Sequence, residues 1–289
     1  MISIKNKNIK VKIDEVGAEL KSAIKKDYEY IWQGDPQVWK GQAPNLFPLI
    51  GRLKDEEYIY NGSSYHMGIH GFAKVSLFEI VEQGESYVTL RLAGNEKTYP
   101  SYPFDFELLI SYELKDLSIV KKYAVTNNSY KPMYFEAGGH DGYNLTFSPQ
   151  HKMDEYYLEF SDESVYTYTT DEKIMVNKSK KEIKVENRKL YLHPDVFKND
   201  ALILDCSKMK ERLVSLKAPD SSRGVKVTFD DFAYLGIWTK PVYSNYVCIE
   251  PWSSLPDCNF IDKNLENKIG IIKLDSNRSE MLSYTVEII

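Results

Sequence analysis

Four side chains that could carry acid, base or hydrogen-bonding chemistry stand in apolar, glycine-punctuated stretches of this sequence. Arg52 follows the run Phe-Pro-Leu-Ile-Gly, and His70 is followed by Gly-Phe. His140 follows two glycines, and Glu250 ends the run Tyr-Val-Cys-Ile. Polar groups in such surroundings are typical of a partly buried concave site that faces a small ligand. The two halves of this set lie far apart in the chain, so only the fold can bring them together.

Glu250 stands at the end of an apolar strand pattern and precedes Pro251 and Trp252. Burial disfavours the charged form of a carboxyl group and raises its pKa toward the working pH, as a general base requires. The structural alternative is a glutamate that pairs with a lysine or caps a backbone amide. The apolar neighbours favour a functional role for Glu250.

His140 lies among three glycines, at positions 138, 139 and 142. Glycines allow close backbone approach or positive φ, so we expect a loop that presents the imidazole to a ligand, with an ordinary turn as the alternative. The carboxylate of Asp141 would favour a protonated His140. The spacing His66-x3-His70 suits a metal site mainly on a helix, and this glycine-containing stretch does not look helical, so no metal is predicted.

Composition excludes several classes of function. The chain has 289 residues, a net charge of −5, 43% hydrophobic and 27% charged residues, and no basic patch typical of a nucleic-acid-binding protein. No apolar run is long enough to cross a membrane, and the alternating N-terminus does not resemble a secretory signal, so a cytoplasmic protein is expected. Cys206, Cys248 and Cys258 lack paired spacing and are expected to be reduced thiols.

Alternation of apolar and polar residues with period two dominates the chain. It is clear in residues 2–4, 9–13, 104–112 and 224–229, and the last residues, 281–289, also have a strand pattern. Turn-forming residues separate adjoining strands, and amphipathic helices of the kind required by βαβ units do not recur. The polar interval 171–188 is expected to be exposed. These patterns predict a predominantly antiparallel, all-β fold in one domain spanning residues 1–289, with both chain ends in the core.

Short motifs recur in an order that resembles the aldose 1-epimerase (galactose mutarotase-like) superfamily, and within it the LacX-like branch. The matching segments are Gly17-Ala18-Glu19-Leu20, Trp32-Gln33, residues 43–52, His70-Gly71-Phe72-Ala73, His140, Gly236-Ile237-Trp238 and Ile249-Glu250-Pro251-Trp252 with Asp257. They run from about residue 11 to near the C-terminus. The resemblance implies a β-supersandwich fold and the interconversion of the α and β anomers of a sugar.

The resemblance also implies roles for individual residues. Glu250 corresponds to the general base and His140 to the general acid, while Arg52 and His70 correspond to groups that hold sugar oxygens. Asp200 corresponds, on a weaker match, to an aspartate that contacts sugar hydroxyls. Three aromatic residues are candidates to pack on the sugar or, alternatively, to serve only the core: Trp252, Tyr143 and Trp238. The expected ligand is a small sugar, and neither cofactor nor metal is required.

Two departures from the family pattern fall at the rim of the expected site. Asp141-Gly142 stand where a proline and an aromatic usually follow the histidine, and Ser253-Ser254 replace an aromatic-glycine pair after the glutamate motif. The substrate can therefore differ from a free hexose, and a phosphorylated sugar would need further cations at the rim. Two other functions stay open, a non-catalytic sugar-binding protein and a glycoside hydrolase with Asp141 or Asp257 as its second carboxyl group. The sequence leaves the oligomeric state open.

Overall fold

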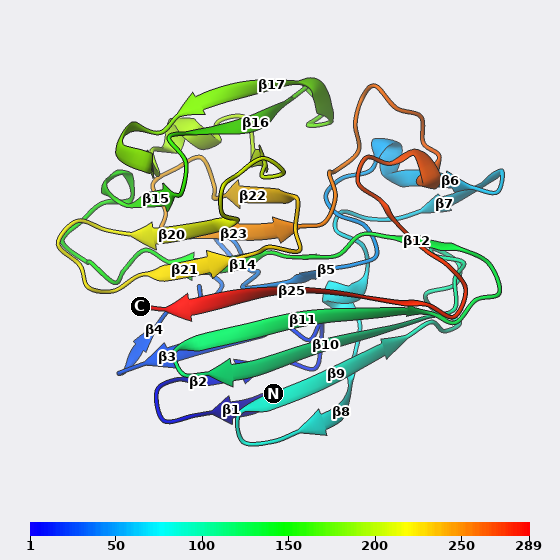
Figure 1. The fold of residues 1–289 in the computed structure, drawn as a ribbon, viewed down its shortest axis with the longest axis horizontal. Helices are drawn as coiled ribbons and strands as arrows, with labels where there is room; N and C mark the ends of the chain where they lie inside the picture. The colour runs from blue at the N-terminus through cyan, green and yellow to red at the C-terminus, as the bar shows by residue number, and fades with distance from the viewer.

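Antiparallel β-sheets build this protein, whose computed structural model describes residues 1–289 (Figure 1). The largest sheet has nine strands in the order β18-β15-β20-β21-β25-β11-β10-β9-β8. Their bounds, in chain order, are β8 (Glu79–Gln83), β9 (Tyr87–Ala93), β10 (Phe106–Lys115), β11 (Ser118–Asn127), β15 (Tyr157–Phe160), β18 (Lys189–Tyr191), β20 (Leu213–Lys217), β21 (Val225–Thr228) and β25 (Ser279–Ile288).

An eight-stranded sheet carries Glu250 and Trp252 on one strand and has His140 between two others. Its strands follow the order β17-β16-β19-β22-β23-β13-β5, and β14 also pairs with β23. The bounds are β5 (Asn45–Leu46), β13 (Gly138–Gly139), β14 (Asp141–Asn144), β16 (Ser164–Thr170), β17 (Val176–Lys184), β19 (Leu202–Asp205), β22 (Tyr234–Trp238) and β23 (Tyr246–Trp252). All seven residues of β23 are buried, which explains why its sequence is almost continuously apolar around Glu250.

Three small sheets and six short 3-10 helices complete the fold. The small sheets comprise β1 (Ile2–Lys5), β2 (Lys10–Ile13), β3 (Leu20–Lys25) and β4 (Tyr28–Glu29), then β6 (Glu57–Tyr60) with β7 (Ser63–His66), and β12 (Met133–Phe135) with β24 (Ile272–Leu274). The helices are η1 (Lys54–Glu56), η2 (Ala73–Val75), η3 (Met153–Glu155), η4 (Glu186–Arg188), η5 (Pro194–Phe197) and η6 (Leu265–Asn267). A search for a helix of sufficient length and apolarity to span a membrane finds none.

The all-β prediction is confirmed, because alternating side-chain burial follows the period-two patterns. Strand β11 alternates between half-buried and buried residues over its whole length, as expected for a strand with one face on the core. A turn at Lys115-Asp116 joins β10 to β11, with Lys115 opposite Ser118. The polar interval 171–188 is exposed as expected, but it forms the edge strand β17 of the eight-stranded sheet.

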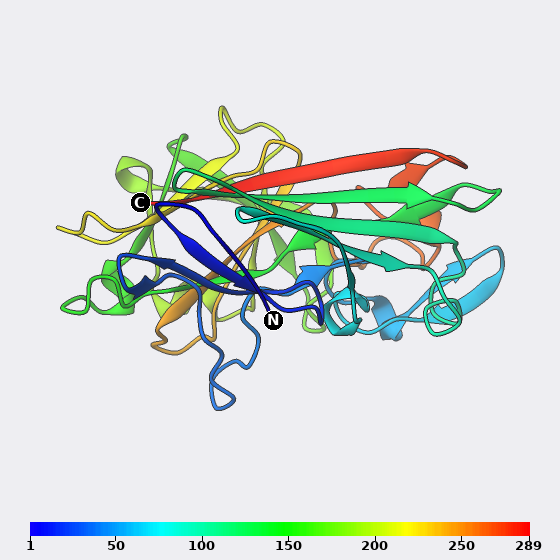
Figure 2. The ribbon, with the colours of Figure 1, turned by 90° about the horizontal axis from the view of Figure 1, so that it is seen from below.

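The large sheets enclose a hydrophobic cluster of 67 buried residues that extends from Ile2 to Ile288, so both chain ends contribute to the core. Figure 2 shows the long strands β9, β10, β11 and β25, coloured cyan to red, lying together as one layer of the molecule. Tyrosines connect this layer to the strands of the eight-stranded sheet. The hydroxyl of Tyr123 on β11 donates to Asn45 on β5 at 2.7 Å, and that of Tyr284 on β25 donates to Asp141 on β14 at 2.7 Å. These bonds fix the strands that bear His140 against the core.

Candidate active site

A pocket of about 600 Å³ is lined by residues of the eight-stranded sheet and of the loops that connect to its strands. Every predicted site residue lines it, from five separate parts of the chain: Arg52, His70, His140, Asp200, Glu250 and Trp252. Residues that were not assigned to the site also line it, above all Glu19, Trp39, Lys40 and Lys74. The fold thus joins the two halves of the predicted site in one concave surface.

Strand register sets His140 against Glu250. Strand β13 pairs antiparallel with β23 so that Gly138 lies opposite Trp252, and β14 continues in the same register. His140, between β13 and β14, is therefore opposite Glu250 on the neighbouring strand, and both side chains project into the pocket. The Nε2 atom of His140 is 3.3 Å from the Oε2 atom of Glu250.

The His140–Glu250 pair is buried and short of hydrogen-bond partners. Side-chain exposure is 11% for His140 and 1% for Glu250, and neither the imidazole Nδ1 nor either carboxyl oxygen has a hydrogen-bond partner. Burial raises the pKa of Glu250 well above its usual value, and the negative charge of Asp200 acts in the same direction. Burial lowers the pKa of His140 to about 3. Both shifts favour the neutral form of the group concerned, with the proton of the pair on Glu250.

An aromatic wall covers one side of this pair. Trp39 lies 5.2 Å from the His140 ring and Trp238 lies 5.9 Å from it, between ring centroids. Trp39 also stacks on Tyr246 at 5.4 Å. A Cβ atom at residue 142 would stand 2.8 Å from the Trp39 ring, so this position requires Gly142. The departure from the family pattern after His140 therefore makes room for Trp39, which the sequence did not reveal because its local surroundings are polar.

His70 is held in one tautomer by its own loop. The backbone N–H of Gly51 donates to Nδ1 of His70 at 3.1 Å, and the backbone N–H of His70 donates to the carbonyl of Gly51 at 2.9 Å. With Nδ1 accepting, the ring proton lies on Nε2, where it can serve as a donor. Burial lowers the pKa of His70 well below its usual value, and the interaction with His140, which disfavours charge on both imidazoles at once, acts in the same direction. His70 is thus a neutral hydrogen-bond donor at the pocket wall.

Arg52 and Asp200 face each other across the pocket. One guanidinium nitrogen of Arg52 lies 3.8 Å from a carboxylate oxygen of Asp200. Asp200 adopts a left-handed backbone conformation, with φ of 75°, immediately before β19. The weak sequence match that placed Asp200 beside the other site residues therefore agrees with its position.

A buried charge network lies behind Arg52. Lys268 is 2.5 Å from Asp257 and 3.4 Å from Glu136, and all three residues are buried. Glu136 also bonds to the hydroxyl of Ser254 at 2.8 Å. The second departure from the family pattern, at Ser253-Ser254, thus supplies a hydroxyl to this network.

This network holds the backbone on both sides of Arg52. A Glu136 oxygen accepts the N–H of Ile50 at 2.6 Å, and an Asp257 oxygen accepts the N–H of Lys54 at 2.8 Å. The N–H of Asp257 donates to the carbonyl of Arg52 itself at 3.1 Å. Asp257 therefore positions Arg52 and does not line the pocket.

The expectation that Asp141 would favour a protonated His140 is wrong. His140 precedes a strand rather than standing in a loop, so His140 and Asp141 project to opposite faces of the sheet. Asp141 lies in the core, 3.1 Å from the ammonium group of Lys121, and accepts a hydrogen bond from Tyr284. Its charge is neutralised there, and burial decides the pKa of His140 instead.

The aromatic candidates divide between pocket and core. Trp252 and Trp238 line the pocket. Tyr143 is fully buried, and its hydroxyl lies 3.4 Å from Asp141, so it is a core residue. The indole nitrogen of Trp252 is buried and makes no hydrogen bond of good geometry, but its N–H acts on the Glu250 carboxyl and lowers the pKa of that group, in opposition to burial.

The pocket offers a poor set of metal ligands. His66 is exposed and lies beside Glu56, away from His70 in the pocket. The donor atoms of His140, Cys248 and Glu250 lie within 4.8 Å of one another. Burial raises the pKa of the Cys248 thiol well above its usual value, so it is a neutral thiol, whereas metals bind thiolates.

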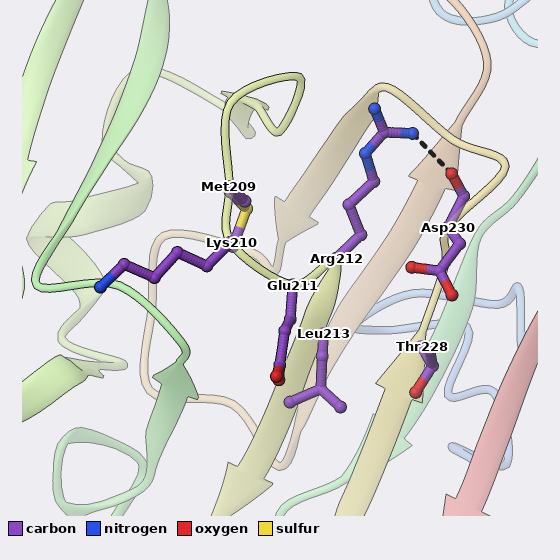
Figure 3. A pocket seen from close by; sticks show the side chains of 7 residues that line it. All are labelled: Met209, Lys210, Glu211, Arg212, Leu213, Thr228 and Asp230. Atoms are coloured by element: carbon purple, nitrogen blue, oxygen red, sulfur yellow. Dashed lines mark hydrogen bonds between the residues drawn. The ribbon is translucent and has the colours of Figure 1, made fainter.

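A second hollow, of about 480 Å³, opens at the ends of β20 and β21 (Figure 3). Its only bond among the residues drawn joins the guanidinium of Arg212 to the backbone carbonyl of Asp230 at 2.5 Å. No acid and base are in contact in this hollow, in contrast to the pocket that holds His140 and Glu250.

Known proteins resemble this chain in sequence and in fold. The family model described as aldose 1-epimerase matches residues 1–268. The plasmid-encoded protein LacX of Lactococcus lactis subsp. lactis is 32% identical, over 100% of this chain and 99% of LacX. A galactose mutarotase related enzyme from Lactobacillus acidophilus superimposes with a TM-score of 0.93 at 33% identity, covering 100% of this chain and 97% of the other.

A galactose mutarotase-like protein from Lactobacillus casei ATCC 334 has a TM-score of 0.94 at 29% identity, with both chains covered completely. The β-supersandwich predicted from the sequence is thus confirmed, as is the resemblance on which it rested. The chain belongs to the aldose 1-epimerase family.

Proposed function

We propose that this protein interconverts the α and β anomers of an aldose by acid-base catalysed opening and reclosure of the sugar ring. The single observation that carries the proposal is the buried contact between His140 and Glu250, whose free oxygen and nitrogen atoms face the pocket. Groups with strongly shifted pKa values in a concave pocket are typical of acid-base sites. Membership of the aldose 1-epimerase family gives independent support.

The reaction needs one group that accepts a proton and one that donates it. Glu250 takes the proton of the C1 hydroxyl while His140 gives a proton to the ring oxygen, the C1–O5 bond breaks, and a free aldehyde forms. Rotation about C1–C2 presents the other face of the carbonyl, and the reverse transfers close the ring as the opposite anomer. Each step conserves the one proton that the pair shares, so the pair is ready for another turnover in either direction.

Substrate binding sets the protonation state for this step. Desolvation and, after it, the charge of Asp200 raise the pKa of Glu250 and so favour its neutral carboxyl form. A C1 hydroxyl that donates to Glu250 stabilises the carboxylate and moves the shared proton across 3.3 Å to His140. Charged His140 then protonates the ring oxygen.

The remaining pocket residues hold the sugar. The Nε2–H of His70 and the guanidinium of Arg52 donate to sugar oxygens, while Asp200 accepts from hydroxyl groups. Trp252 and Trp238 provide apolar surface for a face of the ring. None of these groups needs to change protonation state during the reaction.

A hydrolase has less support from the geometry. Asp141 and Asp257, the carboxyl groups considered as partners of Glu250, are bound to buried lysines outside the pocket. A binding protein without catalysis has no need for the unpartnered acid and base, which are costly to bury.

Polarimetry of freshly dissolved α-glucose and α-galactose tests the proposal. The protein should increase the rate constant of equilibration in proportion to its concentration, without changing the equilibrium rotation. Sugar binding without acceleration would indicate a binding protein. Release of a reducing end from a glycoside would indicate a hydrolase.

A further inference from the structure

Two lysines line the pocket without a carboxylate partner. Lys40 follows Trp39 of the aromatic wall, and Lys74 lies in η2, beyond His70. The ammonium group of Lys74 donates to the backbone carbonyl of Ile69 at 2.6 Å, which leaves two of its three N–H bonds free. The two side chains come from loops more than thirty residues apart and meet on one pocket.

The carboxylates of the pocket are engaged elsewhere. Glu19 is paired with Lys21 at 3.0 Å. Asp200 faces Arg52 at 3.8 Å, and Glu250 faces His140 at 3.3 Å. The positive charges of Lys40 and Lys74 are therefore not neutralised by the residues that surround the pocket.

Charge is separated along the pocket. The charges that act on Glu250 are the negative charges of Asp200 and Asp141. Lys74 instead acts on His70 and His140, and its own pKa is lowered by burial and by the nearby charge of Lys40. Lys40 is exposed and Lys74 is half-buried, and the like charges of two such residues on one pocket repel each other unless an anion lies between them.

Backbone hydrogen bonds on both sides of Lys74 hold the base of its side chain in place. The N–H of Ala73 donates to the carbonyl of Phe47 at 3.1 Å, and the N–H of Gly17 donates to the carbonyl of Ser76 at 2.7 Å. A Cβ atom on Gly17 would approach the carbonyl oxygen of Lys74 to 2.7 Å, so the strand-linking segment at Gly17 packs directly beneath Lys74.

We propose that Lys40 and Lys74 bind an anionic substituent of the sugar, so that the preferred substrate is a phosphorylated aldose rather than a neutral hexose. This inference rests on the proposed function and names the substrate class of the same site. Two ammonium groups match the double negative charge of a phosphate ester better than the single charge of a uronic acid. The phosphate lies on a carbon other than C1, because a free C1 hydroxyl is required for ring opening.

The kinetic test compares glucose and galactose, each with and without a 6-phosphate, and includes glucuronate. The ratio of kcat/KM for the phosphorylated over the free sugar should be well above one. In Lys40→Met and in Lys74→Met this ratio should fall by about 10- to 100-fold, the usual size of a lost hydrogen bond to a charged group. Lys54→Met is the matched control, since Lys54 is an exposed lysine near Arg52 that does not line the pocket, and it should leave the ratio unchanged.

A binding measurement separates this inference from the proposed function. Calorimetric titration with 1,5-anhydroglucitol and its 6-phosphate uses ligands that cannot mutarotate, since both lack the C1 hydroxyl. The phosphate form should bind more tightly to the wild type, and this preference should be lost in Lys40→Met and in Lys74→Met. Both variants should keep the wild-type melting temperature. This result would support the inference even if no sugar were turned over. Equal affinity for the two analogues, or a phosphate preference that survives both substitutions, would overturn it. A higher kcat/KM for glucuronate than for the sugar phosphates would identify a carboxylate as the anion and would also overturn the inference.

Discussion

Two buried acid-base pairs lie almost back to back in this molecule, and they are built in opposite ways. His140 and Asp141 are consecutive residues, yet His140 faces Glu250 in the pocket and Asp141 faces Lys121 in the core. The core pair is satisfied, because Asp141 also accepts from Tyr284 and Lys121 lies 5.3 Å from the centre of that tyrosine ring. The pocket pair leaves its oxygens and one ring nitrogen without partners.

The difference shows how one strand can serve both stability and chemistry. A buried carboxylate with a cation and hydrogen-bond donors stays charged and holds its neighbours in place. A buried carboxyl group without them keeps a raised pKa and can exchange a proton with a ligand. We therefore expect substitutions in the pocket pair to affect rate and those in the core pair to affect folding.

The largest effect is expected from Glu250→Gln. Loss of the proton acceptor should lower the rate of anomer interconversion by about 10² to 10⁴-fold. Because the pKa of Glu250 is raised in the folded state, the carboxyl costs stability above its unfolded value near 4.5, and the neutral amide avoids this cost. Polarimetry should show the loss of rate, and calorimetry at pH 7 a melting temperature at or above that of the wild type. A large loss of stability would mean that Glu250 is part of the structural core.

Lys121→Met should act on folding. It leaves the Asp141 carboxylate buried without its cation, which typically costs about 3–5 kcal/mol in free energy of unfolding. The double variant Lys121→Met/Asp141→Asn should recover much of this loss, because no unpaired charge remains. Urea denaturation measures both. If the single and double variants were equally destabilised, the pair would not be coupled as described.

Arg52→Ala should weaken substrate binding. Removing a charged hydrogen-bond donor should raise KM by about 10- to 100-fold with little change in kcat, provided that Arg52 holds the sugar and takes no part in proton transfer. Arg52→Lys keeps the charge but not the planar fork, so it should recover only part of the affinity. A fall in kcat as large as that of Glu250→Gln would place Arg52 in the chemistry itself.

The pH profile provides the mildest test. The pair is active while it holds one proton, so rate is lost at low pH only when His140 takes up a second proton, with a pKa of about 3. It is lost at high pH when Glu250 releases the shared proton, well above 4.5. We expect kcat/KM to show no acidic limb between pH 5 and 7. An inflection near 6.5 would mean that His140 titrates as an exposed histidine and is not desolvated.

The sequence predicted the all-β fold and the residues that meet in the pocket, because alternation and short motifs are local signals. The glycines near His140 were interpreted as a loop that presents the imidazole, whereas Gly142 accommodates Trp39 from about a hundred residues away. Side chains alternate between the two faces of a strand but not in a loop, so that interpretation did not predict that Asp141 points into the core.

Contacts between distant segments account for what the sequence did not reveal. Trp39 and Lys40 lie in a polar stretch with no strand pattern, and their place at the pocket depends on the packing of the whole molecule. Lys268 and Glu136 are likewise brought together only by the fold, and no spacing in the sequence predicts their support of Arg52.

The central claim is that His140 and Glu250 together move the protons of ring opening. Its most direct test is the polarimetric rate constant for equilibration of an α-aldose with the double variant His140→Asn/Glu250→Gln, compared with the wild-type protein and with buffer alone. The account predicts clear acceleration by the wild type and a double variant that is indistinguishable from buffer while it still folds. Acceleration retained by the folded double variant would contradict it.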